Sequence, residues 1–225
     1  MAALSLVDAK TNAEEYKIVH FLYKHNRSIR KISTGNIYKQ TLLSRLNFTK
    51  DYKIITVKKK LHIYDNHCKD IYLILEDDIK SYRSKYQFLH IGLVQISIEM
   101  NSDNYVPHMP VRLRDSKYSN VEDSILVSFA TSVDNRVVKF NWFPNFSTCL
   151  SDLENSNALV VTIDPPKTIE RVMNEKYPLG YEPLLKVRYR VCYKLMKTSL
   201  KPDYLFQNPV VQVNTDITNF VVPQF

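Results

Sequence analysis

The segment from Leu185 to Leu195 alternates between apolar and polar side chains without interruption. Successive side chains of a β-strand point to opposite faces, whereas a helix would mix the two kinds around its circumference. The segment is therefore predicted to be a strand with one buried and one basic face. The apolar face would carry Leu185, Val187, Tyr189, Val191, Tyr193 and Leu195, and the basic face Lys186, Arg188, Arg190, Cys192 and Lys194.

A second alternating segment runs from Lys53 to Tyr64, and Lys58, Lys60 and His62 share its basic face. The run from Tyr86 to Glu99 is apolar on both faces at first, which indicates a central strand that runs toward the rim of a sheet. Short β-branched and aromatic runs predict further strands. These are Ile71–Leu75, Met109–Arg114, Ser124–Thr131, Val137–Phe143, Ala158–Ile163 and Val210–Val213.

Many short strands with few helices among them predict a mainly β fold, an antiparallel jelly-roll sandwich. The chain has 225 residues, of which 44% are hydrophobic, and this is enough for one sizeable core. Only three glycines occur, so most turns are expected to use Asn, Asp, Ser and Pro. The expected organisation is a short helical N-terminal arm at residues 1–50 and a single jelly-roll domain at residues 51–225.

The helical arm is predicted from its capping signals. Asn12 and Glu15 have the spacing of a helix N-cap and its capping-box partner, and they lead into a helix over Tyr16–Lys24. A second helix is predicted over Asn36–Leu46. A last helix, over Ile169–Lys176, would end before the following proline and glycine.

The chain lacks the sequence signatures of familiar enzymes. It has no glycine-rich nucleotide loop, no phosphate loop, no zinc-protease motif and no nucleophile elbow. His90 falls among apolar neighbours, so it is predicted to be a satisfied core histidine and not a catalytic base. We therefore predict a protein without enzymatic activity and without a cofactor.

Three cysteines, Cys68, Cys149 and Cys192, are too few and too scattered for a disulfide framework or a zinc clip. One cluster has residue types that bind metals, but its spacing fits no common zinc pattern, so no metal site is predicted and its role stays open. It consists of His62, Asp65, His67, Cys68 and Asp70. The N-terminus does not resemble a secretory signal and no apolar run approaches ~20 residues, so a cytosolic protein is expected.

The net charge of +8 comes from the first 90 residues, where 17 basic residues stand against 9 acidic ones, while the remainder has 14 of each. A second local excess runs from Lys186 to Lys201, with six basic residues and no acidic one. Such segregation favours a polyanion partner, either nucleic acid or an anionic membrane surface.

The two basic strand faces suit a phosphate backbone. Side chains on one face of a strand recur every ~6.6 to 6.8 Å, a distance comparable to the phosphate spacing of an extended single strand. The candidate contacts are Lys58, Lys60, Lys186, Arg188, Arg190 and Lys194. The alternative is that these residues only solubilise a sheet face or protect an edge strand. Tyr189 and Tyr193 alternate to the apolar side, so base stacking and specific base recognition are not predicted.

Between Tyr86 and Ile163 the sequence resembles the thirty-kilodalton superfamily of plant-virus movement proteins, most closely the movement domain of plant pararetroviruses of the caulimovirus and badnavirus type. The segments that carry the resemblance are, in order, Leu89–Ile96, Val111–Tyr118, Phe143–Phe146 and Leu150–Asp152. The resemblance implies a jelly-roll core, binding of single-stranded nucleic acid with little sequence preference, self-association and targeting to plasmodesmata.

The hallmark glycine and aspartate of that family correspond to Gly92 and Asp115. Gly92 is expected on the inward side of its strand, where a missing Cβ leaves room for a large neighbour or a bulge. Asp115 closes a strand, and its carboxylate is expected to cap the following turn. Both residues are interpreted as architectural.

The leading prediction is a viral cell-to-cell movement protein that binds single-stranded nucleic acid without sequence preference, assembles with itself as an oligomer or tubule, and acts in the host cytoplasm and at plasmodesmata. Plasmodesmal host proteins, a viral capsid protein and an anionic membrane surface are further partners that the resemblance implies. The alternatives are a capsid-like structural jelly-roll protein and a basic peripheral membrane adaptor. The cargo, the number of subunits, the host partner and a viral or plant-genome origin all stay open.

Overall fold

A computed structural model gives the fold of the chain. It describes residues 17–20, 32–39, 51–100, 109–131, 137–153, 159–165, 183–198, 201–206, 210–213 and 217–221.

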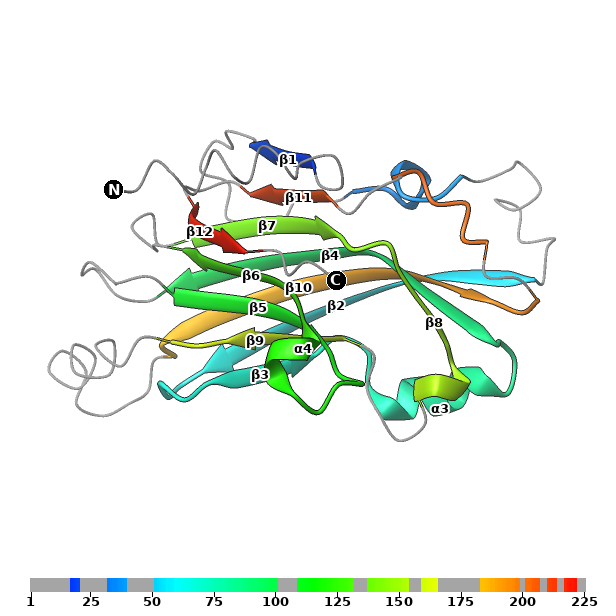
Figure 1. Ribbon diagram of the computed structural model, residues 1–225, viewed down its shortest axis with the longest axis horizontal. Helices are drawn as coiled ribbons and strands as arrows, with labels where there is room; N and C mark the ends of the chain where they lie inside the picture. The colour runs from blue at the N-terminus through cyan, green and yellow to red at the C-terminus, as the bar shows by residue number, and fades with distance from the viewer. Residues whose placement is uncertain are drawn as a thin grey trace, which may run out of the picture.

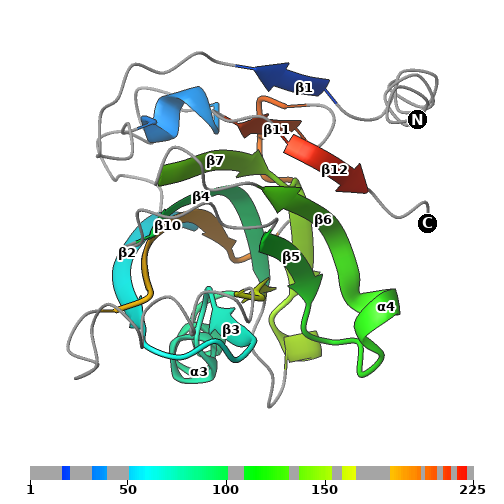
Figure 2. The same ribbon diagram turned by 90° about the vertical axis from the view of Figure 1, so that its left-hand side faces the viewer.

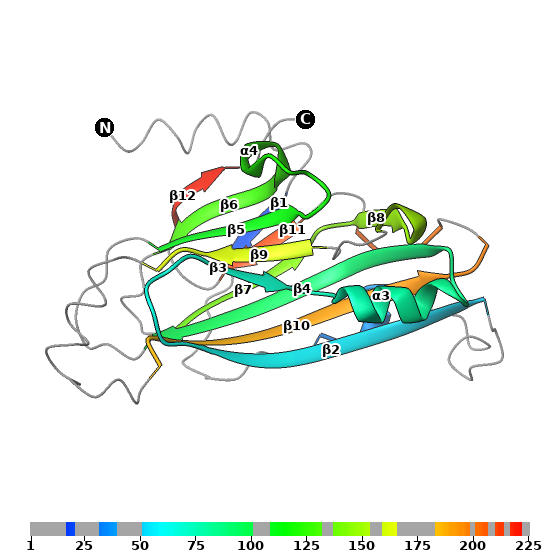
Figure 3. The same ribbon diagram turned by 90° about the horizontal axis from the view of Figure 1, so that it is seen from below.

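Two sheets make up the described part of the molecule (Figures 1 and 2). The larger sheet has the order β1 (Lys17–His20), β11 (Val210–Val213), β7 (Val137–Phe143), β4 (Phe88–Met100), β10 (Leu185–Met196), β2 (Tyr52–Ile63), with β8 (Phe146–Cys149) also paired to β4. The smaller sheet has the order β12 (Ile217–Val221), β6 (Ile125–Thr131), β5 (Met109–Asp115), β9 (Leu159–Ile163), β3 (Lys69–Tyr72). Figure 3 shows the three long strands β4, β10 and β2 side by side.

The strand pairs nest around one hairpin. β5 pairs with β6, β4 with β7, β3 with β9 and β2 with β10, and every one of these pairs is antiparallel. The pairs alternate between the two sheets, so that the order is β7-β4-β10-β2 in one and β6-β5-β9-β3 in the other. Eight strands wound in this way form a jelly roll, which confirms the predicted fold class.

The main core lies between the two sheets. The predicted apolar face of β10 is buried as expected, with Val187, Val191 and Leu195 each 0% exposed. Burial of one such side chain is worth about 1.5–3 kcal/mol, so this single strand contributes much of the core. A second, smaller cluster covers the opposite face of the larger sheet. It consists of Ile37, Tyr38, Leu93, Phe143 and Cys192.

Short helices close the ends of the sandwich. Helix α3 (Glu76–Arg83) was not predicted, although its first turn carries three acidic residues and its last turn two basic ones, as the helix dipole favours. Its one buried residue, Ile79, packs into the main core. Arg83 donates to the Leu150 carbonyl at 2.9 Å, beside the 3₁₀ turn η2 (Ser151–Leu153). Helix α4 (Val121–Ser124) is a single turn before β6, and the Asn120 side chain caps it.

The N-terminal arm differs from its prediction. Strand β1 occupies Lys17–His20, inside the predicted helix Tyr16–Lys24, so the helix is wrong there. Parallel pairing with β11 satisfies the backbone of these residues and overrides their capping signals. In the second predicted helix only a short stretch is described: the 3₁₀ turn η1 (Thr34–Asn36) precedes Tyr38, which bridges to Tyr204. The predicted helix Ile169–Lys176 lies outside the described residues.

Gly92 forms a β-bulge in β4, because Leu93 pairs with Cys192 and Ile91 with Tyr193, which leaves Gly92 without a partner on β10. A Cβ atom on Gly92 would lie 2.5 Å from the Tyr38 hydroxyl oxygen. The sequence predicted a large neighbour or a bulge at this position, and the structure has both. The predicted inward direction is wrong, because the bulge shifts the alternation and turns Gly92 toward the second cluster on the outer face of the sheet.

Replacing Gly92 by alanine is expected to lower the free energy of unfolding by about 1–3 kcal/mol, because Tyr38 must move from its buried position. Chemical denaturation measures the change. In a Tyr38→Ala background the same substitution should cost clearly less, since the nearest obstructing side chain is gone. An equal cost in both backgrounds would show that Tyr38 does not set the need for glycine.

Candidate nucleic-acid interface

Cross-strand register places the two predicted basic rows side by side on the outer face of the larger sheet. His62, Lys60 and Lys58 of β2 lie directly opposite Lys186, Arg188 and Arg190 of β10. Directly opposed residues of an antiparallel pair share a face. The sequence-predicted cations at this end of the two strands therefore come together. We call the surface formed by Lys58, Lys60, His62, Lys139, Lys186 and Arg188 the cationic face.

Lys139 of β7 belongs to this face but was missed in the sequence. Ser97 of β4 lies opposite both Arg188 and Lys139, so a row crosses four strands from Lys60 to Lys139. Burial and the Arg188 charge lower the pKa of Lys139. The signal that could have found it is its alternation with the buried Val138 and Phe140.

The cationic face borders one carboxylate among the described residues of its four strands. Arg188 Nη1 lies 3.0 Å from Glu99 Oε2. Glu99 is opposite Lys186 on β4 and is 19% exposed. The cationic face has five lysines and arginines and one neighbouring carboxylate, so its net charge is strongly positive. Such a surface attracts polyanions and repels other positively charged surfaces.

Exposure divides the predicted row of β10. Lys58 and Lys60 are exposed and Lys186 and Arg188 half-buried, whereas Arg190 is 5% exposed and Lys194 only 1%. The prediction that all six candidate side chains line an open face is therefore wrong for Arg190 and Lys194. The physical reason is that residues 32–39 and 201–206 lie over this end of the sheet and accept hydrogen bonds from both residues.

The two buried cations differ in their partners: Arg190 bonds to neutral oxygens, whereas Lys194 also faces a carboxylate. Arg190 donates to the Gln95 side-chain oxygen and to the Ile32 carbonyl, both at 3.2 Å. Lys194 donates to the Pro202 carbonyl at 2.9 Å and lies 3.2 Å from the Asp203 carboxylate. Its ammonium group also lies 4.1 Å from the centre of the Tyr52 ring.

His90 is buried, as predicted, in the same covered region. Its Nε2 lies 3.0 Å from the Asn145 side-chain oxygen, and its Nδ1 lies 3.1 Å from the Tyr38 hydroxyl. Burial, against the opposing effect of the Asn145 hydrogen bond and with a smaller contribution from the Lys194 charge, lowers the pKa of His90 to about 4. The ring is a neutral structural element at neutral pH, and Tyr204 packs against it with ring centres 4.7 Å apart.

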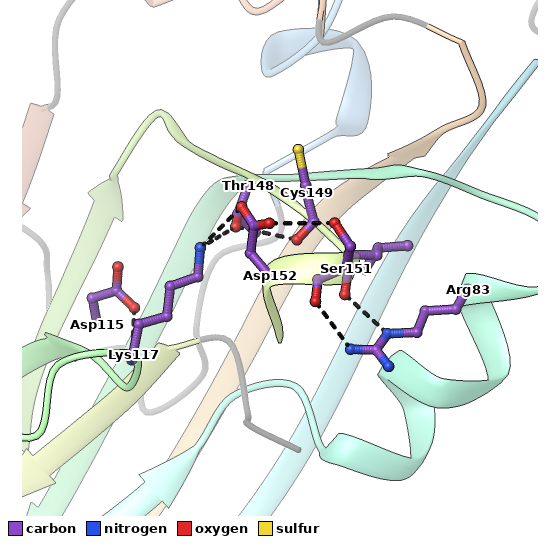
Figure 4. A network of polar contacts seen from close by, with 8 residues as sticks. Arg83, Asp115, Lys117, Thr148, Cys149, Ser151 and Asp152 are labelled. Carbon is purple, nitrogen blue, oxygen red and sulfur yellow. Dashed lines mark hydrogen bonds and ion pairs between the residues drawn. The ribbon is translucent and has the colours of Figure 1, made fainter. Parts of the chain in front are cut away.

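Asp115 lies at the end of β5, remote from the cationic face, and caps the following turn as predicted. Its Oδ1 accepts a hydrogen bond from the Lys117 backbone N–H at 3.1 Å. Burial raises the pKa of the Asp115 carboxyl, and the bond from Lys117 opposes part of this rise. Figure 4 shows the Lys117 side chain reaching toward Thr148 and Asp152, at 2.5 Å and 3.7 Å. The group joins β5 to β8 and η2, which is an architectural role.

The cluster around His62, His67 and Cys68 is occupied with ion pairs. Asp65 Oδ2 lies 2.9 Å from Lys69 Nζ, and Asp70 Oδ2 lies 2.6 Å from Arg114 Nη2. Within the described residues no three side chains of the metal-binding kinds converge.

Tyr64 next to this cluster is 58% exposed, and its hydroxyl lies 3.4 Å from His62 Nδ1. It is an exposed aromatic side chain at the end of the cationic face that sequence reasoning missed, although it continues the alternation after His62.

The strand order defines a jelly-roll protein, and the cationic face gives it a surface suited by charge to polyanions. The sequence model of the family described as viral movement protein (MP) matches residues 15–204, so the chain belongs to the viral movement protein family. This membership supports a role in the cell-to-cell movement of a virus. The likeness to the pararetrovirus branch stays a prediction. No curated protein sequence matches the chain.

Several solved viral structures are similar to the chain at low identity. A structure of Desmodium yellow mottle tymovirus has 8% identity and a TM-score of 0.36, with 83% of this chain and 96% of that chain covered. One of turnip yellow mosaic virus has 8% identity and a TM-score of 0.37, with 65% and 93% covered. The tobacco streak virus coat protein dimer has 9% identity and a TM-score of 0.33, with 71% and 96% covered. The fold assignment rests on the strand order and not on these similarities.

Helices in the described part of the chain are all too short or too polar to cross a membrane.

Proposed function

We propose that this movement protein binds single-stranded nucleic acid without sequence preference through the cationic face, and that it carries out cell-to-cell transport at plasmodesmata. The observation that carries the proposal is the register of β2 and β10. It sets Lys60 opposite Arg188, and Lys58, two residues away on the same face of β2, opposite Arg190. We expect no enzymatic activity.

The spacing of the cationic face fits a phosphate backbone. Side chains two residues apart along a strand are ~6.6 to 6.8 Å apart, and neighbouring strands are ~4.8 Å apart. A single strand that runs along the boundary of β2 and β10 can thus meet Lys58 and Lys60 on one side and Lys186 and Arg188 on the other. These contacts are to phosphate, so they carry no sequence information.

Tyr64 can add a contact of a different kind. Its exposed ring stands at the end of the β2 row, edge to face with His62 at a centroid distance of 6.2 Å. Stacking of a base on an aromatic ring is tolerant of sequence, because every base has a π-face. The ring would therefore raise the affinity without adding base recognition.

Equilibrium binding of labelled oligonucleotides tests the proposal. Three to five phosphate contacts predict that log affinity falls against log salt with a slope between about 2 and 3.5, at about 0.7 per phosphate of a single strand. Oligothymidine, mixed-sequence DNA and RNA of equal length should bind with similar affinity. A salt-independent affinity, or a strong preference for one sequence, would contradict the proposal.

Two further arms separate the alternative functions. A membrane adaptor would be indicated by two results together. Liposomes with anionic lipid would displace the oligonucleotide, and the chain would not bind nucleic acid in cells. Closed, uniform shells in electron micrographs would indicate a structural capsid-like protein. A fluorescent fusion in leaf epidermis should give puncta in the cell wall and spread to neighbouring cells, whereas a diffuse signal confined to one cell would contradict the plasmodesmal role.

A further inference from the structure

Two segments that are distant in sequence form a cover over one end of the larger sheet. We call residues 32–39 together with residues 201–206 the strap. Backbone hydrogen bonds join its two parts, from Lys39 N to Asp203 O at 2.7 Å and from Leu205 N to Ile37 O at 3.0 Å. In Figure 1 the blue turn of η1 lies beside the orange segment that follows β10.

The strap lies on the continuation of the cationic row. Arg190 and Lys194 follow Lys186 and Arg188 on the same face of β10, with the buried Cys192 between them. The strap accepts hydrogen bonds from both buried cations through the carbonyls of Ile32 and Pro202. The strap therefore separates an open half of the row from a covered half.

Burial of these two cations is poorly compensated. The guanidinium of Arg190 bonds to two neutral oxygens, and its buried Nε has no hydrogen-bond partner among the residues that the structure describes. The carboxylate that faces Lys194 belongs to Asp203, whose side chain is 59% exposed. Desolvation of an ion destabilises the folded chain unless well-placed partners compensate for it. In the closed state the desolvation of Arg190 and Lys194 is therefore only partly compensated, and a phosphate group would compensate for it.

We infer that the strap occludes an extension of the phosphate-binding site, in which Arg190 and Lys194 take further phosphates of the same nucleic-acid strand once the strap lifts. This inference rests on the proposed function, because the open half of the row must first bind nucleic acid. With the strap released, the open row of cations on β10 would extend from Lys186 to Lys194. Its full length would be about 27 Å, at ~3.4 Å per residue.

The strap can lift without loss of the jelly roll. Its buried residues Ile37 and Tyr38 belong to the second cluster, and its Tyr204 and Phe206 pack against that cluster, which is separate from the main core between the sheets. Tyr38 packs directly against Gly92, and its hydroxyl donates a hydrogen bond to the His90 carbonyl at 3.1 Å. Removal of this side chain is therefore expected to weaken the attachment of the strap, so that it lifts more often, while the main core stays intact.

Cys192 reports the state of the strap. It is 1% exposed, lies between the two occluded cations, and burial raises the pKa of its thiol. A thiol that is buried and protonated reacts slowly with a disulfide reagent. In a Cys68→Ser, Cys149→Ser background, slow labelling of the folded chain is expected, and faster labelling in the Tyr38→Ala variant marks a lifted strap.

Oligonucleotide binding then tests the inference. With the strap lifted by Tyr38→Ala, the salt slope should become steeper by about 1.4, which is two phosphates at about 0.7 each. Adding Arg190→Gln and Lys194→Gln to that variant should return the slope to the value of the unaltered chain. The same two substitutions without Tyr38→Ala should leave the slope unchanged, because the strap is closed.

Three results would overturn the inference. Cys192 that stays unreactive in both Tyr38→Ala and Gly92→Ala would show that the strap does not lift. A reactive Cys192 with an unchanged slope would show that the uncovered cations take no phosphate. A loss of slope on Arg190→Gln and Lys194→Gln in the unaltered chain would show that they are not occluded. In each case Lys58→Gln with Lys60→Gln still reports on the open half, so failure of the proposed function is seen separately.

Discussion

Replacing Lys58, Lys60 and Lys186 together by glutamine is expected to lower the affinity for a single-stranded oligonucleotide about 100-fold at 0.1 M salt and to flatten the salt slope by about 2. Each phosphate of a single strand contributes about 0.7 to the slope, so three contacts correspond to this factor between 1 M and 0.1 M salt. Fluorescence anisotropy titrations over a series of salt concentrations measure both quantities. Arg188 stays in place in this variant because it pairs with Glu99, and its removal would leave that carboxylate without its cation.

A matched variant controls for net charge. Lys69, Lys80 and Lys85 lie on β3 of the smaller sheet, on α3 and just after it, outside the cationic face, and all three retain partial or full exposure; Lys69 and Lys80 pair with Asp65 and Glu76. Their replacement by glutamine removes the same formal charge from the molecule. If this variant loses as much affinity as the first, binding depends on overall charge, and the cationic face is not the site.

Acid is expected to destabilise the fold through His90 by about 3 kcal/mol between pH 6.5 and pH 4. The pKa of His90 is lowered from 6.5 to about 4 in the folded chain, so within this range the unfolded state binds a proton that the folded state does not. Stability from this group is therefore complete above pH 6.5, falls as the pH falls, and levels off below about 4. The groups that face the ring are Tyr38, Tyr204 and Lys194, and Lys194 disfavours the protonated ring.

The control is His90→Gln, which keeps a polar side chain beside Asn145 but cannot titrate. Asp115 titrates with the opposite sign, because its raised pKa lets the folded state gain a proton first, and the difference between the two chains removes its contribution. Urea denaturation across the pH range should give a difference curve that rises by about 1.4 kcal/mol per pH unit at its steepest. A flat difference curve would show that folding does not lower the pKa of His90.

Much of the fold could be predicted because alternation is a local property. The bounds of Val137–Phe143 and Val210–Val213 are those of β7 and β11, and the Leu185–Leu195 strand differs from β10 by one residue. Strand β8 was missed because it depends on a sharp turn at Asn145, which has a positive φ of 48°. Strand β1 was missed because its partner β11 lies almost two hundred residues away, and no local pattern encodes that pairing.

The candidate site was predictable in its strands and not in its cover. Alternation fixed which side chains of β2 and β10 share a face, and the register then joined Lys60 to Arg188. Burial of Arg190 and Lys194 depends on the strap, which packs there through Tyr38 and Gly92, two residues of unrelated segments. Period-two patterns report the direction of a side chain and carry no information on what a distant segment places above it.

Lysine acetylation mapped by mass spectrometry, with and without bound oligonucleotide, tests the central claim most directly. Lys58, Lys60 and Lys186 should be protected by the oligonucleotide, and the protection should disappear at high salt. Lys69, Lys80 and Lys85 should be modified equally in both samples. Protection of these three lysines instead, or equal modification of the cationic face with and without oligonucleotide, would contradict the account.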